Sequence, residues 1–393
     1  MEIAGEGPRR ITAWEKAILG VRIGEVPRLL PGLALALGLA LLAQAIAGRL
    51  GAALLAAQGL DPAGRGSPIS AIPVAVLLGM AIANLAGLHR AFAPGVDFAV
   101  KKVLRLGIVL VGIQLSAVDV LRIGAVGVPI VAALVAFALF ASIGVARAAG
   151  ASGALGALAA ASTAICGITA TLAVAPGVDA DEREVACTVA NVTVFGLFGM
   201  LVYPWVAHGI FGDASAAAGL FLGTAIHDTS QVMGAALSYR ELFGDPRAME
   251  VATITKLTRN AMLVAVVPLL AWLHARRAGG AGRRTGLAHL FPVFVLGFLA
   301  LSLLRTAGDL GLAGGGLALG AFDAAAWRGL TARLGGELAI LALGTALAGV
   351  GLGPRLSVFR GLGPRPFLVG LAAALLVGGA ALGLAALCGP LLG

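Results

Sequence analysis

Residues 223–232 read Gly-Thr-Ala-Ile-His-Asp-Thr-Ser-Gln-Val and carry five consecutive polar side chains, His227 to Gln231, inside an apolar segment. Five neighbouring positions cannot share one face of a helix, because 3.6 residues complete a turn. Irregular backbone at membrane depth is tolerated only where protein or water surrounds it. The stretch therefore predicts a helix that is interrupted within the membrane and helps to form a binding site. The alternative is a short extracellular loop that divides the segment.

The composition of the whole chain requires lipid as the solvent for most of it. Of the 393 residues, 59% are hydrophobic and only 12% are charged, and the mean hydropathy is +0.99. A soluble domain carries about 25% charged residues, and no soluble protein of this size could bury so much apolar surface in one core. The net charge of +9 comes from basic loops between apolar segments, so we expect no nucleic-acid partner.

Apolar segments long enough to cross a bilayer recur along the chain. About 20 such residues span the hydrocarbon core as a helix. Eleven spans are predicted, at residues 29–48, 69–88, 104–121, 124–146, 153–177, 186–207, 215–236, 251–273, 287–305, 336–353 and 367–390. We therefore predict an all-α polytopic membrane protein, with a cytoplasmic amphipathic segment at 1–28 and a single transmembrane transport domain at 29–393.

The distribution of basic residues predicts the orientation, because cytoplasmic loops collect Lys and Arg. With a cytoplasmic N-terminus, eleven spans place the main basic clusters on one side; these lie at residues 9–28, 90–105, 147, 276–284 and 355–365. The acidic loop at 179–184 then falls outside. We expect a multi-pass protein of the bacterial inner membrane whose C-terminus is periplasmic.

Two parts of the chain resemble each other. Residues 106–115 (LGIVLVGIQL) match residues 343–352 (LGTALAGVGL), and the related parts extend over about 69–146 and 287–390. Their spans are offset by seven, an odd number, so the copies would be inverted, as in many secondary transporters. The alternative is chance similarity between helices rich in Gly, Leu and Ala. The offset does not pair the fifth span with the seventh.

A second polar stretch interrupts the fifth span. Residues 162–171 read Ser-Thr-Ala-Ile-Cys-Gly-Ile-Thr-Ala-Thr, which predicts another interrupted helix that meets the first near the membrane midplane. The alternative is ordinary helix packing, since hydroxyl side chains can bond back to their own helix.

Two basic residues lie inside the eighth span. Lys256 and Arg259 are three positions apart and share one helix face, and each costs about 2.5–3.5 kcal/mol at the centre of a membrane helix. Asp228 could neutralise one of them, and the surplus positive charge predicts an anionic substrate. The alternative is that both side chains reach the membrane interface.

The chain resembles the YeiH-type family of bacterial inner-membrane proteins, which carry the label of sulfate exporters. The resemblance extends from about Ile72 to Gly370, and its landmarks are LRLGIVLVG at 104–112, Ile165-Cys166-Gly167, IHDTSQV at 226–232 and KLTR at 256–259. It implies export of a sulfur oxyanion or a small sulfonate. In the family pattern Ser-Ile-Cys-Gly-Ala-Ser-Ala, this chain has Ala164 in place of the first Ser and Thr169 in place of the second, so one hydroxyl is missing.

Together these features predict a secondary transporter, acting as an exporter of a small anion by alternating access. The predicted substrate-binding residues are Thr163, Cys166, Gly167, Thr169, Asn191, Thr229, Ser230, Gln231, Lys256 and Arg259. His227 and Asp228 are predicted to couple or gate transport, since His changes charge near neutral pH and intramembrane acids mark relays. We expect a proton or sodium ion as coupling ion, and Gly-rich faces would permit a homodimer. No cofactor, metal or enzymatic activity is predicted.

Three other classes of protein remain compatible with the sequence. An ion channel would share the polar midplane residues. An intramembrane enzyme could use Cys166 as nucleophile and His227 as base. A sensor or structural protein would carry no flux.

Overall fold

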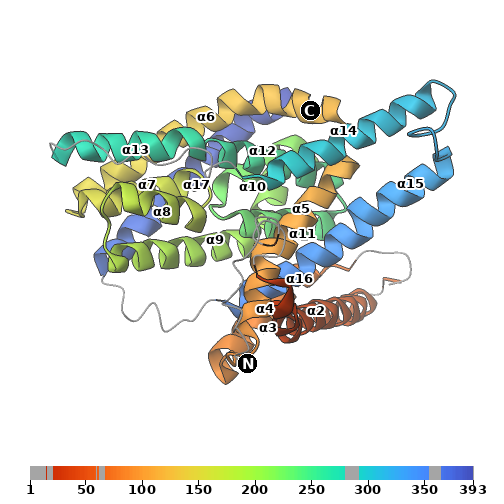
Figure 1. The fold of residues 1–393 in the computed structure, drawn as a ribbon, viewed down its shortest axis with the longest axis horizontal. Coiled ribbons are helices and arrows are strands. Elements are labelled where there is room, and N and C mark those ends of the chain that lie inside the picture. Colours follow the sequence, from red (N-terminus) through yellow and green to blue (C-terminus); the bar gives the residue numbers. More distant parts are fainter. Residues whose placement is uncertain are drawn as a thin grey trace, which may run out of the picture.

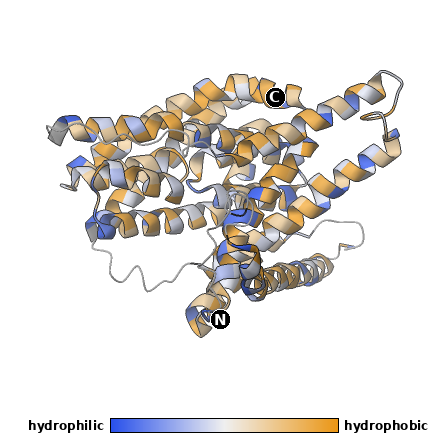
Figure 2. Cartoon of the chain, in the orientation of Figure 1, coloured by the Kyte–Doolittle hydropathy of each residue, from blue (hydrophilic) through white to orange (hydrophobic). Residues whose placement is uncertain are grey.

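The computed structural model describes residues 15, 21–58, 60–61, 67–278, 292–353 and 364–392, and these ranges are almost entirely helical. No strand occurs in them beyond one isolated bridge between Ala318 and Phe322. Within these ranges, seven helices are long and apolar enough to cross a membrane. Large side chains such as Leu85, Phe140 and Leu387 are exposed, and most of the helical ribbon consists of hydrophobic residues (Figure 2). The prediction of an all-α polytopic membrane protein is confirmed.

As far as they lie in the described residues, the eleven predicted spans each correspond to one helix or to a chain of consecutive helices (Figure 1). Residues 287–291 of the ninth span and most of the predicted amphipathic segment at 1–28 lie outside the described residues. The first four units are η1 (Ile23–Leu29) with α2 (Leu30–Ala57); α3 (Ala71–Ala81) with η2 (Ile82–Ala86); α4 (Ala93–Phe98), η3 (Ala99–Val103), α5 (Leu104–Val111) and η4 (Gly112–Gln114); and α6 (Ala117–Ala148). The next four are α7 (Gly153–Ala164), α8 (Ile168–Val174) and η5 (Ala175–Gly177); α9 (Glu182–Phe211); α10 (Ser215–Ala225) with α11 (Thr229–Phe243); and α12 (Pro246–Ala261) with α13 (Leu263–Ala278). The last three are α14 (Phe294–Ala313); α15 (Ala324–Ala332), η7 (Arg333–Leu338) and α16 (Ala339–Leu352); and α17 (Pro364–Cys388) with η9 (Gly389–Leu392).

The helices form two groups that pack against each other. Helices α2 to α5 and α14 to α16 contact mainly one another, and helices α6 to α13 with α17 form the second group. In Figure 1 the first group occupies the lower right and right of the molecule. The groups meet where α11 packs on α3 and α16 and where α6 packs on α14. All of the predicted site residues lie in the second group.

The helices α7 and α8 form a hairpin that returns to the end of the molecule where it began. The backbone leaves the helix at Ile165 (φ −121°, ψ −96°) and turns at Gly167, whose φ of +62° favours glycine. The hydroxyl of Ser152, just before α7, donates to the Glu184 carboxylate in the first turn of α9. The start of α7 and the start of α9 are therefore at the same end, and α8 carries the chain back.

The helices α10 and α11 form a second hairpin at the opposite end of α9. The Tyr239 hydroxyl, near the end of α11, donates to the Gly212 carbonyl just before α10 (3.3 Å). The rings of His208 and Phe243 stack with centroids 3.8 Å apart, which places the end of α11 beside the end of α9. Asp228 caps the start of α11, so the turn lies between Ala225 and Thr229.

Helix α9 runs from one end of the molecule to the other. The two hairpins therefore enter the protein from opposite ends, and their turns meet inside it. A Cβ added to Gly167 would lie 3.3 Å from Cα of Asp228. Both interruptions predicted from the sequence are confirmed, but the return of the chain was not foreseen, since hydropathy does not distinguish a span from a hairpin. The prediction that the loop at 179–184 lies on the opposite side from Arg147 is wrong, because Ser152 contacts Glu184.

The hairpins predict which positions share a side of the membrane. In a variant without the native cysteines, Ala148→Cys and Asp179→Cys should react with an impermeant thiol reagent from the same side. Asp213→Cys and Arg247→Cys should react from the other side. Labelling of right-side-out and inverted vesicles tests this arrangement. Reaction of the cysteines at 148 and 179 from opposite sides would mean that the segment from α7 to α8 crosses the membrane.

Candidate functional site

Helix α12 lies against both hairpin turns and supplies two cations to them. Glycines on α10 permit this close approach, since a Cβ at Gly223 would lie 2.8 Å from the Ala252 carbonyl oxygen. The Lys256 and Arg259 side chains are both fully buried, at 0% exposure. Neither reaches the membrane interface, so the interfacial alternative is excluded.

Arg259 binds the final carbonyl groups of the first half of each hairpin. Its Nη2 donates to the Thr163 carbonyl (2.7 Å) and its Nε to the Ala164 carbonyl (3.1 Å), both at the end of α7. Its Nη1 lies within hydrogen-bonding distance of three carbonyls at the end of α10, those of Gly223 (3.2 Å), Thr224 (2.6 Å) and Ile226 (3.0 Å). One guanidinium therefore joins the two hairpins.

Lys256 binds carbonyl groups that lie nearer to the hairpin turns than most of those bound by Arg259. Its Nζ donates to the carbonyls of Ile165 (2.9 Å) and Ile226 (3.3 Å). A third carbonyl, that of His227, also accepts from Nζ. The ammonium group thus bridges the same two hairpins as Arg259.

These contacts satisfy a requirement of helices that end inside a membrane. The last four carbonyls of a helix have no partner within it, and the aligned peptide dipoles place about half a negative charge there. Lipid cannot donate hydrogen bonds to them. Lys256 and Arg259 meet this demand through the backbone, whereas the sequence predicted Asp228 and a substrate anion as their partners.

Asp228 instead organises the start of α11. Its Oδ1 accepts from the Ser230 backbone N–H (2.9 Å) and from the Ser230 hydroxyl (2.5 Å). Beside it, the Asn260 side-chain amide donates to the Thr229 hydroxyl (3.1 Å). The first turn of α11, which has the positive end of the helix dipole, is thus held by polar side chains from α11 and α12.

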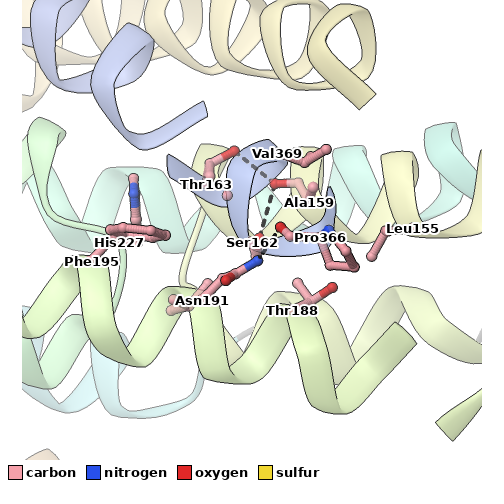
Figure 3. Close-up of a pocket in the computed structure, with 12 residues that line it drawn as sticks. Leu155, Ala159, Ser162, Thr163, Thr188, Asn191, Phe195, His227, Pro366 and Val369 are labelled. Carbon is pink, nitrogen blue, oxygen red and sulfur yellow. Dashed lines mark hydrogen bonds between the residues drawn. The ribbon is translucent and has the colours of Figure 1, made fainter. Parts of the chain in front are cut away.

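A narrow pocket lies beside the second hairpin turn and is lined in part by His227 (Figure 3). Its lining comes from α7, α9 and the start of α17, and His227 is at its inner end. The polar residues that line it are Ser162, Thr163, Thr188, Asn191 and His227. The space open to a water-sized molecule is about 10 Å³, close to what one water requires.

Two buried polar atoms of residues that line this pocket have no hydrogen-bond partner. The Asn191 side-chain N–H donates to the Pro366 carbonyl (2.7 Å), but its Oδ1 is unpaired, as is Nδ1 of His227. A buried polar atom without a partner costs about 1–3 kcal/mol. These two atoms, in residues that line a pocket, are the candidates for a hydrogen bond to water or to a ligand.

The remaining predicted residues are divided between the turns and their surroundings. Cys166 is buried at the first turn, whereas Thr169 is exposed on α8. The Gln231 amide donates to the Thr193 carbonyl (3.1 Å) and its Oε1 is unpaired. The sequence analysis missed Ser162, Thr188 and Asn260. Thr188 lies three positions before Asn191, hence on the same face of α9, and this spacing could have indicated it.

Comparison with known proteins identifies the family. The family model described as conserved hypothetical protein 698 matches residues 31–370. The chain belongs to this family. It is the YeiH-type family that the sequence resembles, also designated UPF0324, so the resemblance is confirmed.

Relatives in the UPF0324 family are named as membrane proteins. The chain is 36% identical over 286 residues to UPF0324 membrane protein TauZ of Paracoccus denitrificans, covering 72% of this chain and 78% of the relative. It is 31% identical over 298 residues to a UPF0324 membrane protein of Bacillus cereus, covering 76% and 81%. No solved structure matches. The names agree with the multi-pass membrane architecture.

The contacts of Arg259 predict a structural defect when it is removed. Arg259→Ala leaves the ends of α7 and α10 without their shared donor, and breaking a buried charge interaction costs about 3–5 kcal/mol. We expect a large fall in the unfolding temperature of the detergent-solubilised protein. Arg328→Ala, at an exposed position, is the control and should change it little. An Arg259→Ala protein as stable as the wild type would refute the assigned role.

Proposed function

We propose that this protein is a secondary transporter of a small anion, with its substrate site at the meeting point of the two hairpin turns. The observation that supports this most strongly is the pair of helices broken inside the membrane from opposite ends. Transporters place substrate and ion sites where such discontinuous helices meet, and helix N-termini there face anionic groups. In this arrangement the substrate approaches the first turn of α11 and His227.

The charges at the turns favour an anion. Each hairpin turn combines a carbonyl end and an amide end, whose partial charges largely offset each other. Lys256 and Arg259 then exceed the single carboxylate of Asp228 by one positive charge. A buried site with one surplus positive charge is stabilised by a singly charged anion or by one charge of a larger one. A sulfur oxyanion or small sulfonate is the substrate class we propose to test first.

The pocket indicates the route to the site. Leu155, Thr188 and Pro366 line it near the starts of α7, α9 and α17, and His227 lines its inner end. By the distribution of basic residues, we propose that this end is cytoplasmic, with the N-terminus cytoplasmic and the C-terminus periplasmic. At the other end, His208 and Trp205 pack on Phe243. Alternating access would widen the pocket and later separate these rings.

One close approach between α5 and α16 agrees with the proposed inverted repeat, although a Cβ at Gly344 would meet only Ala40 within 4 Å. The repeat pairs Gly107 with Gly344, and a Cβ at Gly107 would lie 3.2 Å from the backbone nitrogen of Leu343, next to its counterpart. Two helices related by a two-fold axis that cross on that axis must meet at equivalent positions. We propose that α5 and α16 are such a pair, which is the symmetry that secondary transporters use for alternating access.

Anion flux into proteoliposomes tests the proposal. Sulfate, sulfite, thiosulfate, small sulfonates and dicarboxylates form the panel. Asn191→Leu and His227→Phe should each lower flux of the accepted anion about tenfold or more, since a polar partner worth about 1.4 kcal/mol is lost. Thr193→Val, at a half-buried position on α9, should retain it.

The same assay distinguishes the other classes of protein. Cys166→Ser should retain flux, whereas an enzyme with a Cys166 nucleophile would lose its activity. A transporter should saturate with substrate, and a channel should not. Equal flux through the wild type, Asn191→Leu and His227→Phe would contradict the proposed site.

A further inference from the structure

The surroundings of Lys256 have the composition of a binding site for a metal cation. Its Nζ contacts three backbone carbonyls, those of Ile165, Ile226 and His227. Carbonyl oxygens are ligands of hard cations. In transporters with broken helices, unwound carbonyls and the C-terminal ends of half-helices coordinate sodium. Here both hairpins supply those carbonyls.

The ammonium group of Lys256 fills this position completely. An ammonium has three donors, and three carbonyls accept from it. The side chain is fully buried. The Arg259 guanidinium is adjacent, since its Nη1 shares the Ile226 carbonyl at 3.0 Å, and it would repel a further cation. The other ionisable groups around Lys256 are Asp228, Cys166 and His227.

We infer that the Lys256 ammonium is the built-in occupant of a cation site shared by the two hairpin turns, so that joining the turns requires no sodium or other alkali ion. Where other transporters would recruit an ion from solution, this chain carries the positive charge on α12. The inference that Lys256 occupies a cation site is independent of the proposed function. Its consequence, that transport proceeds without sodium, rests on the proposed function.

Removing the side chain should expose the site to cations from solution. Lys256→Ala deletes the atoms of an n-propylammonium ion and leaves its carbonyl ligands in place. We expect this variant to unfold several degrees below the wild type in choline chloride. n-Propylammonium chloride should restore the unfolding temperature saturably, and sodium should do so in part. n-Propanol, which has the same length but no charge, should not. Lys101→Ala, at an exposed residue paired with Asp97, is the control.

A second experiment uses the wild-type protein and therefore does not depend on whether the Lys256→Ala variant folds. Its unfolding temperature should agree within about 1 °C in sodium, potassium and choline chloride of equal ionic strength, because a ligand stabilises only if it binds the folded state. Saturable stabilisation of the wild type by sodium would overturn the inference. So would a folded Lys256→Ala protein that no cation stabilises.

Flux measured with choline in place of sodium tests the functional consequence. Wild-type flux of the accepted anion should be unchanged, and a strict sodium requirement would overturn that consequence. If no anion on the panel is carried while n-propylammonium still restores Lys256→Ala, the proposed function fails and the cation site stands. If flux is present and cation rescue is absent, the cation site fails alone.

Discussion

The attraction between two buried cations and the carbonyl ends of two broken helices is the interaction on which the rest of the structure depends. A helix that stops inside a membrane leaves carbonyl groups that lipid cannot satisfy. Two such ends lie together here, and Arg259 and Lys256 on the neighbouring helix bind both of them. Because each cation contacts both hairpins, the two side chains hold the hairpin turns against each other.

The hydrogen bonds of Lys256 and Arg259 to the carbonyl ends of the helices explain how polar groups at the centre of the protein are compatible with the membrane. The cations bind the carbonyl ends of the helices, and the substrate site that we propose lies beside them, at the first turn of α11 and in the pocket lined by Asn191 and His227. The unpaired atoms of these two side chains are tolerated because a ligand or water can complete them. The proposed binding residues Asn191 and His227 are thus distinct from Lys256 and Arg259 on α12, which bind backbone carbonyls.

The sequence predicted the class of fold and the two interruptions, because hydropathy and a run of five polar residues are local signals. It could not show that α8 and α11 turn back, since a returning segment is as apolar as a crossing one. The sequence identified Lys256 and Arg259 as cations inside a membrane span, where a charge costs free energy. Counting the charges nearby suggested Asp228 and a substrate anion as their partners. Backbone carbonyls are common to all residues and leave no trace in sequence, so their role was visible only in the structure.

The central claim is that Arg259 holds both hairpin turns at once. Hydrogen–deuterium exchange of the wild type and Arg259→Gln tests it most directly, with peptides that cover residues 162–168, residues 223–231 and the middle of α6. The account predicts faster exchange at both turns in the variant, with α6 unchanged. Faster exchange at one turn only, or at neither, would show that the two hairpins are held together by other contacts.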